Sequence, residues 1–161
     1  MRSHIMYLYR ICNKINKSNT YKRYTLLWII NKIFLKIVYK YYSSLLSLFY
    51  GAYLPFTASI GTNLTLNHSF HGIFISENAI IGDNCILIQH TTIGSNQPLS
   101  SEAPHIGHNV FIGVNCSIIG KTIIEDNCII GAGTVISNSF IKKGSIVVGS
   151  KYKILNKDNN V

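Results

Sequence analysis

The sequence predicts a mainly β protein in which six-residue repeats wind into a parallel β-helix, preceded by a short α-helical segment. Three observations predict this fold class. An aliphatic side chain recurs at every sixth position through the middle of the chain, glycine and asparagine recur at set offsets from it, and the first fifty residues follow a different, basic and amphipathic pattern. A chain of 161 residues can bury a core without disulfides or a structural metal.

The distribution of charge divides the chain into three segments, which we predict as residues 1–50, 51–149 and 150–161. The first segment has nine basic residues and no acidic one. Residues 51–141 have one basic and five acidic residues, whereas residues 142–161 have five basic and one acidic. We therefore expect a basic helical segment, a repeat domain and a basic tail.

The middle segment contains the repeat. Its aliphatic positions are Leu54, Ile60, Leu66, Ile75, Ile81, Leu87, Ile93, Ile106, Ile112, Ile118, Ile124, Ile130 and Ile136. Glycine often follows the aliphatic residue directly, asparagine often stands third after it, and a small or β-branched residue stands fourth after it. A period of six with a turn in each unit is typical of a β-solenoid with three units in each coil. We expect the aliphatic and small positions to face inward, the Gly and Asn positions to supply positive φ at corners, and thirteen units to form about four coils.

This rule also assigns three of the four cysteines. Cys85, Cys116 and Cys128 occupy the small inward position, so we interpret them as buried thiols and not as metal ligands or a nucleophile. They lack the paired spacing of a zinc site. We expect no bound metal and a reducing compartment.

Residues 7–50 are predicted to form two or three helices. Around Lys32, Lys36 and Lys40 the side chains are mostly aliphatic or aromatic. Two interpretations remain open: this segment covers the open end of the solenoid, or it contacts a membrane surface peripherally. The lysines interrupt any membrane-spanning run, no signal peptide is visible, and no nucleic-acid-binding motif accompanies the bases. We expect a cytoplasmic protein, with peripheral contact at the inner face of the membrane as the alternative.

Two stretches within Leu54 to Gly149 resemble hexapeptide-repeat acyltransferases. They read LNHSFHGIFISENAIIGDNCILIQHTTIG and PHIGHNVFIGVNCSIIGKTIIEDNCIIGAGTVI. The most similar branch is serine acetyltransferase with the related O-acetyltransferases of capsule and O-antigen synthesis. The resemblance implies a left-handed solenoid, a homotrimer or a dimer of trimers, and acetyl-CoA as co-substrate in the groove between adjacent solenoids.

Direct acetyl transfer to an alcohol requires a general base, oxyanion donors and orientation of both substrates. The resemblance places His68, in the L-x-H element, as the base. His71 stays open as the competing base, because the segment from residue 68 to residue 72 is one residue longer than the family pattern. The residues expected to contact the acceptor substrate are Asn67, His71, Gln89, His90 and His105, although the position of His90 also suits a purely structural corner residue.

Three departures from the serine acetyltransferase pattern bear on the acceptor. Asn67 and Tyr53 stand where the family has aspartates, and Ala103 stands where it has a second active-site histidine. Loss of the carboxylates removes groups that would orient the imidazole and stabilise its charged form. These departures favour the branch that acetylates sugar hydroxyls.

The loop at residues 95–104 interrupts the repeat between Ile93 and Ile106. A solenoid expels such an insertion outward, and in the family the loop folds over the substrate groove; a tolerated surface insertion is the alternative. For CoA we expect a wall of small residues together with basic groups that pair with its phosphates, or else face solvent. These residues are Gly113, Gly131, Ala132, Gly133, Lys142, Lys143 and Lys151.

The predicted function is therefore that of an acetyl-CoA-dependent O-acetyltransferase acting on a hydroxyl of a surface-polysaccharide sugar or its precursor. Serine O-acetyltransferase is the enzymatic alternative, supported by the similarity of the motifs. A non-catalytic trimeric scaffold is the third interpretation, suggested by the missing carboxylates. The sequence does not identify the sugar.

Overall fold

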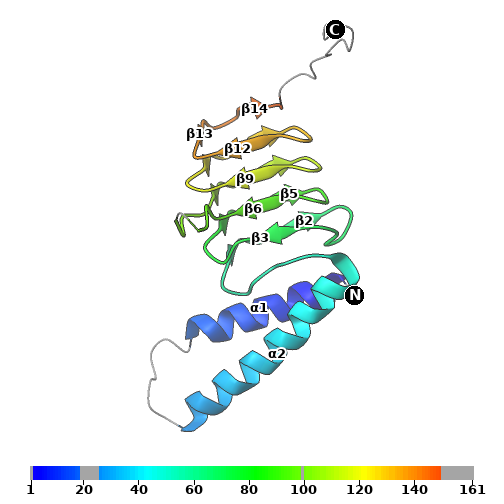
Figure 1. Ribbon diagram of the computed structural model, residues 1–161, viewed down its shortest axis with the longest axis vertical. Helices are drawn as coiled ribbons and strands as arrows, with labels where there is room; N and C mark the ends of the chain where they lie inside the picture. The colour runs from blue at the N-terminus through cyan, green and yellow to red at the C-terminus, as the bar shows by residue number, and fades with distance from the viewer. Residues whose placement is uncertain (1, 19–25, 99, 150–161) are drawn as a thin grey trace, which may run out of the picture.

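The computed structural model of the chain describes residues 2–18, 26–98 and 100–149. Two helices, α1 (Arg2–Ser18) and α2 (Leu26–Tyr50), precede fourteen short strands. The strands stack in coils above the helices (Figure 1). All of their pairings are parallel.

The strands form three sheets, here called faces 1, 2 and 3. Face 1 contains β1 (Ser59–Ile60), β4 (Ile80–Ile81), β7 (His105–Ile106), β10 (Ile123–Ile124) and β13 (Phe140–Ile141). Face 2 contains β2 (Thr65–Leu66), β5 (Ile86–Leu87), β8 (Phe111–Ile112), β11 (Ile129–Ile130) and β14 (Ile146–Val147). Face 3 contains β3 (Phe74–Ile75), β6 (Thr92–Gly94), β9 (Ser117–Ile119) and β12 (Val135–Ser137).

This architecture is the predicted left-handed parallel β-helix. It is one coil longer than expected, because sheets of five, five and four strands make nearly five turns. The additional strands β13 and β14 lie beyond Ile136, where the repeat was expected to end. The inward residue after Ile136 is Ile141, which comes one position early and so shifts the phase of the repeat.

The core follows the repeat. All thirteen predicted aliphatic positions are buried except Ile60, which is half-buried. The small positions are buried as well, including Cys85, Cys116 and Cys128. All four cysteines are free and buried, which confirms the interpretation as buried thiols for the three in the solenoid. Burial raises the pKa of the Cys85 and Cys116 thiols.

The corners depend on asparagine and glycine for different reasons. Positive φ occurs at Asn63, Asn84, Asn109, Asn115, Asn127 and Asn138, as expected for most of the Asn positions. The glycines that follow the inward aliphatic residues do not adopt it, so that part of the prediction is wrong. They are required by close stacking instead: a Cβ on Gly82 would lie 2.5 Å from the carbonyl oxygen of Gly107 in the next coil.

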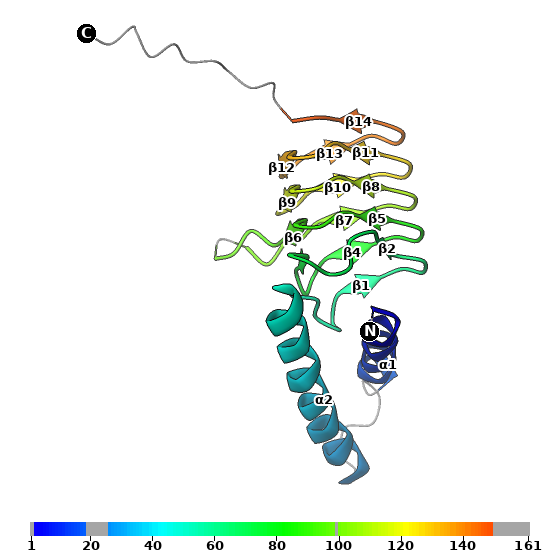
Figure 2. The same cartoon turned by 90° about the vertical axis from the view of Figure 1, so that its right-hand side faces the viewer.

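The two helices cover the open end of the solenoid. Figure 2 shows both beneath the first coil. Tyr9 of α1 and Leu46 of α2 belong to the same buried cluster as Leu54 in the first coil. The Tyr9 hydroxyl donates a 2.6 Å hydrogen bond to the carbonyl of Ala58, and burial raises its pKa to about 12. No helix in the described part of the chain is long and apolar enough to cross a membrane.

Candidate active site

Most of the predicted site residues share one edge of the solenoid, the series of corners that connects face 2 to face 3. We call this series the histidine edge. Backbone hydrogen bonds join its successive coils: His90 N–H donates to His71 C=O at 2.9 Å, Asn115 N–H to Gln89 C=O at 3.2 Å, and Gly133 N–H to Val114 C=O at 2.8 Å. The predicted residues on this edge are Asn67, His68, His71, Gln89, His90, Gly113, Gly131, Ala132 and Gly133.

His68 and His71 lie in the lowest corner of the histidine edge, and both are exposed. This corner is longer than the others and turns through two residues of positive φ, Ser69 and Gly72. The His71 ring meets the Tyr50 ring edge-on, with centroids 5.1 Å apart. His71 is therefore tied to the end of α2, whereas the exposed His68 can face a substrate.

Gln89 and His90 occupy the corner above. His90 has a φ of 58°, the conformation that asparagine adopts at other corners. Its imidazole covers Gly72, so that a Cβ added there would overlap Nδ1. His90 thus has a structural role in this corner. The Oε1 atom of Gln89 is buried and has no hydrogen-bond partner among the described residues, which is uncommon for a buried polar atom.

The remaining predicted residues lie elsewhere on the solenoid. His105 is exposed on face 1, between Ile80 and Ile123 of the neighbouring strands. It lines a cavity of about 270 Å³ together with Lys143, next to Lys142 in the corner between faces 1 and 2. A single chain therefore does not bring His105, Lys142 and Lys143 to the histidine edge. Lys151 lies outside the described residues.

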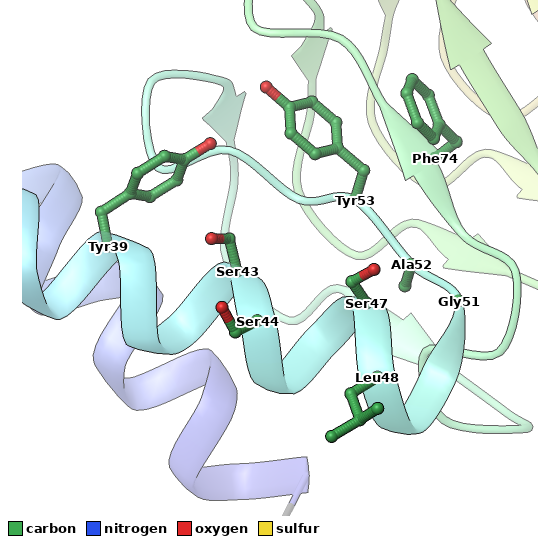
Figure 3. A pocket seen from close by; sticks show the side chains of 9 residues that line it. All are labelled: Tyr39, Ser43, Ser44, Ser47, Leu48, Gly51, Ala52, Tyr53 and Phe74. Atoms are coloured by element: carbon green, nitrogen blue, oxygen red, sulfur yellow. The ribbon is translucent and has the colours of Figure 1, made fainter.

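A groove along face 3 was not predicted. It consists of two cavities, of about 770 Å³ and 420 Å³, that share Tyr53 and Phe74. In the larger cavity Tyr39, Ser43 and Ser47 of α2 lie on one side and Tyr53 and Phe74 on the other (Figure 3). We call the two cavities together the aromatic groove.

The two shared rings form a platform in the middle of the aromatic groove. The rings of Tyr53 and Phe74 stack with centroids 4.9 Å apart and an interplanar angle of 27°. The Tyr53 hydroxyl donates a 3.0 Å hydrogen bond to Glu77 Oε1. Burial, followed by hydrogen bonding with Tyr39 and Glu77, raises the pKa of Tyr53. The only sequence signal for this platform was an aromatic residue directly before an inward aliphatic one.

The described residues of the predicted loop, 95–98 and 100–104, project outward between β6 and β7, as predicted (Figure 2). The loop is fixed to the solenoid by a 3.0 Å hydrogen bond from Asn78 Nδ2 to the Ser101 carbonyl and by a 3.3 Å ion pair between Glu102 and Lys121. Ser95 and Gln97 line the smaller cavity of the aromatic groove. The base of the loop thus closes the upper end of the groove.

Ionisable groups at the corner between faces 1 and 2 have structural partners. Asp83 Oδ1 accepts hydrogen bonds from the backbone N–H of Thr62 at 2.6 Å and from its hydroxyl at 2.9 Å. These bonds, with a smaller contribution from His108, hold the pKa of Asp83 below its usual value. His108 Nδ1 lies 3.3 Å from Asp83 Oδ2. Within the described residues, no group of three or more His, Cys, Asp or Glu side chains could hold a metal ion.

Comparison with known proteins shows which families this chain is similar to. The profile described as "Bacterial transferase hexapeptide (six repeats)" matches residues 103–138. The putative colanic acid biosynthesis acetyltransferase WcaB of Escherichia coli (strain K12) is 28% identical over 126 residues, which are 78% of this chain and 76% of WcaB. The serine acetyltransferase of Staphylococcus xylosus is 35% identical over 102 residues, which are 63% of this chain and 46% of that enzyme. The chain is therefore similar to the hexapeptide-repeat acyltransferases.

Solved structures agree on the fold of this chain. A serine acetyltransferase in complex with CoA superimposes with a TM-score of 0.70 at 20% identity, over 96% of this chain and 57% of that one. The enzyme from Neisseria gonorrhoeae gives 0.69 at 24% identity, over 98% and 56%. The chain therefore spans only about half of the serine acetyltransferases that it matches. Both curated relatives are named acetyltransferases, in agreement with the predicted class of enzyme.

Proposed function

We propose that this acyltransferase uses acetyl-CoA to acetylate a hydroxyl group of a surface-polysaccharide sugar or of its precursor. The observation that carries the proposal is the extent of the match to WcaB. Its 126 residues exceed the described solenoid and the tail together, so the match must reach into the helical segment. The 102 residues matched by the S. xylosus serine acetyltransferase are few enough to lie within the solenoid and tail.

The size and lining of the aromatic groove favour a large acceptor substrate. A cavity of about 770 Å³ is in the range of pockets that bury a drug-sized ligand, and a single amino acid would leave most of it empty. Stacked Tyr53 and Phe74 offer an apolar surface for the C–H face of a sugar ring. Serine hydroxyls on α2 and the polar side chains of Glu77, Asn78 and Gln97 can bond its hydroxyls.

His68 acts as the general base in the proposed reaction. Its imidazole takes the proton of the acceptor hydroxyl while that oxygen attacks the thioester carbonyl carbon. The tetrahedral oxyanion then collapses, the C–S bond breaks, and the new O-acetyl ester remains on the sugar. The proton on His68 passes to the departing CoA thiolate. Backbone N–H groups at a corner can stabilise the oxyanion without reorganising.

We further propose that the active site is completed by neighbouring copies in a homotrimer. The small residues Gly113, Gly131, Ala132 and Gly133 lie above His68 on the histidine edge and leave the backbone accessible to an elongated co-substrate. Lys142 and Lys143 lie on another corner. Only a second copy can bring them to this edge, where they would pair with the CoA phosphates.

An acceptor assay tests this function. Purified protein is incubated with acetyl-CoA and either L-serine or oligosaccharides of bacterial surface polysaccharides, and CoA release is followed with a thiol reagent. The protein itself contributes little background because its four cysteines are buried. We expect turnover with at least one oligosaccharide and little with L-serine. Robust turnover of L-serine alone would establish the serine O-acetyltransferase alternative instead.

Replacing Phe74 tests the aromatic groove as the acceptor subsite. Phe74→Ala removes one ring of the platform, so we expect the KM for the oligosaccharide to rise about tenfold, as loss of a buried aromatic contact predicts. The KM for acetyl-CoA should stay unchanged. The matched control is Phe140→Ala, because Phe140 is also an exposed Phe and begins β13 on face 1. Equal effects of the two substitutions would exclude the groove as the acceptor subsite.

A further inference from the structure

We infer that one face of α2 docks on an anionic lipid surface. The residues of this face, which we call the outer face of α2, are apolar or aromatic and exposed: Ile33 (54%), Phe34 (56%), Ile37 (64%), Tyr41 (63%) and Leu48 (79%). A helix turns by about 100° per residue, which places these five side chains within one sector of its circumference. Soluble proteins rarely expose an apolar stripe of this kind, in which Ser44 is the one polar residue between Ile33 and Leu48.

The outer face is distinct from the face that packs on the protein. Leu35, Tyr42 and Leu46 are buried, and by helical periodicity they lie opposite Ile33 and Ile37. The helix is therefore apolar on two opposite sides, and only one of them has a partner among the residues that the structure describes. The first half of α2 also extends away from the solenoid in both views (Figures 1 and 2), so no coil covers it.

The positive charge of the helical segment favours an anionic lipid surface as the partner of the outer face. Lys36 and Lys40 are exposed at the border of the outer face, and residues 1–50 contain nine basic residues and no acidic one. Apolar side chains flanked by lysines are typical of helices that lie in the interface of an anionic membrane. A second copy of this chain would instead bring two acid-free, basic segments together, which like-charge repulsion opposes.

Docking through the first half of the outer face, from Ile33 to Tyr41, would leave the aromatic groove accessible. Tyr39, Ser43 and Ser47 line the groove at four-residue spacing, on a side of α2 different from that of Ile37 and Tyr41, and Leu48 is the one residue of the outer face that also borders the groove. A membrane-bound chain would thus present the groove close to the lipid head groups. An acceptor attached to a membrane lipid could reach it there, a consequence that rests on the proposed function.

Co-sedimentation with vesicles tests the inference without acetyl-CoA or any activity. We expect the full chain to bind phosphatidylcholine vesicles that contain phosphatidylglycerol, and to bind pure phosphatidylcholine vesicles much more weakly. Ile37→Asp should lower the partition coefficient at least about tenfold, because it places a charge within the apolar stripe. The double variant Lys36→Gln/Lys40→Gln, which leaves the apolar stripe intact, should weaken binding and reduce its salt dependence.

Val135→Asp is the matched control, because Val135 is 72% exposed on β12, far from α2 in the stack of coils. Its binding should equal that of the unsubstituted chain. Equal loss in Ile37→Asp and Val135→Asp, or equal binding to neutral and anionic vesicles, would overturn the inference. A change in molar mass by light scattering for Ile37→Asp, without a change in vesicle binding, would assign the outer face to a second copy and overturn it as well.

Discussion

Replacing His68 with alanine should lower the rate of acetyl transfer at least about 100-fold, the contribution expected of a positioned general base. The substitution should leave the solenoid folded, because His68 is exposed and lies outside the buried core. Initial rates of CoA release at saturating acetyl-CoA measure the effect, and the thermal unfolding midpoint checks the fold.

Two further variants test whether His68, and not another histidine, is the general base. His71→Ala removes a ring that contacts Tyr50, so we expect a modest loss of stability and a much smaller loss of rate. His108→Ala removes a histidine that pairs with Asp83 on another corner, and the rate should not change. A full rate in His68→Ala with a large loss in His71→Ala would transfer the role to His71. Full rates in all three variants would exclude histidine base catalysis at this corner.

The repeat made the fold predictable because burial and chain geometry impose the same period. An inward position recurs only if each strand and corner uses six residues, so the aliphatic pattern directly reports the three faces. The last coil was missed for the same reason: Ile141 follows Ile136 after five residues, so the inward residues Ile141 and Val147 are out of phase with the earlier units.

The candidate site was less predictable, because it depends on which corners stack and not on the period itself. The coils place His68, Gln89 and Gly131 on one edge, but they place His105 on face 1 and Lys143 at another corner. The aromatic groove depends on where α2 lies against face 3, and no local pattern in the sequence reports that contact. In the sequence, Tyr53 stands where the family has an aspartate. Its stacking with Phe74 is visible only in the structure.

Replacing Gly82 with alanine should cost about 3 kcal/mol of unfolding free energy, the upper end of the range for overpacked interiors. A Cβ at this position would lie 2.5 Å from the carbonyl oxygen of Gly107 and 2.6 Å from its carbonyl carbon. Both atoms belong to the backbone of the next coil and cannot rotate away. The two coils would have to separate, which weakens the parallel hydrogen bond from Gly82 N–H to the carbonyl of Ile106, now 2.8 Å long.

Gly133→Ala distinguishes close stacking from backbone conformation as the reason for glycine at the corners. Gly133 has a φ of +68°, and a Cβ there would meet no atom within 4 Å. Gly133→Ala should therefore lower the free energy of unfolding only by the cost of placing alanine in the left-handed region, about 1–2 kcal/mol. Urea unfolding of both variants, at one protein concentration because an oligomer would make stability depend on it, gives the comparison. A larger loss in Gly133→Ala than in Gly82→Ala would show that positive φ, and not the approach of one coil to the next, accounts for the glycines of this solenoid.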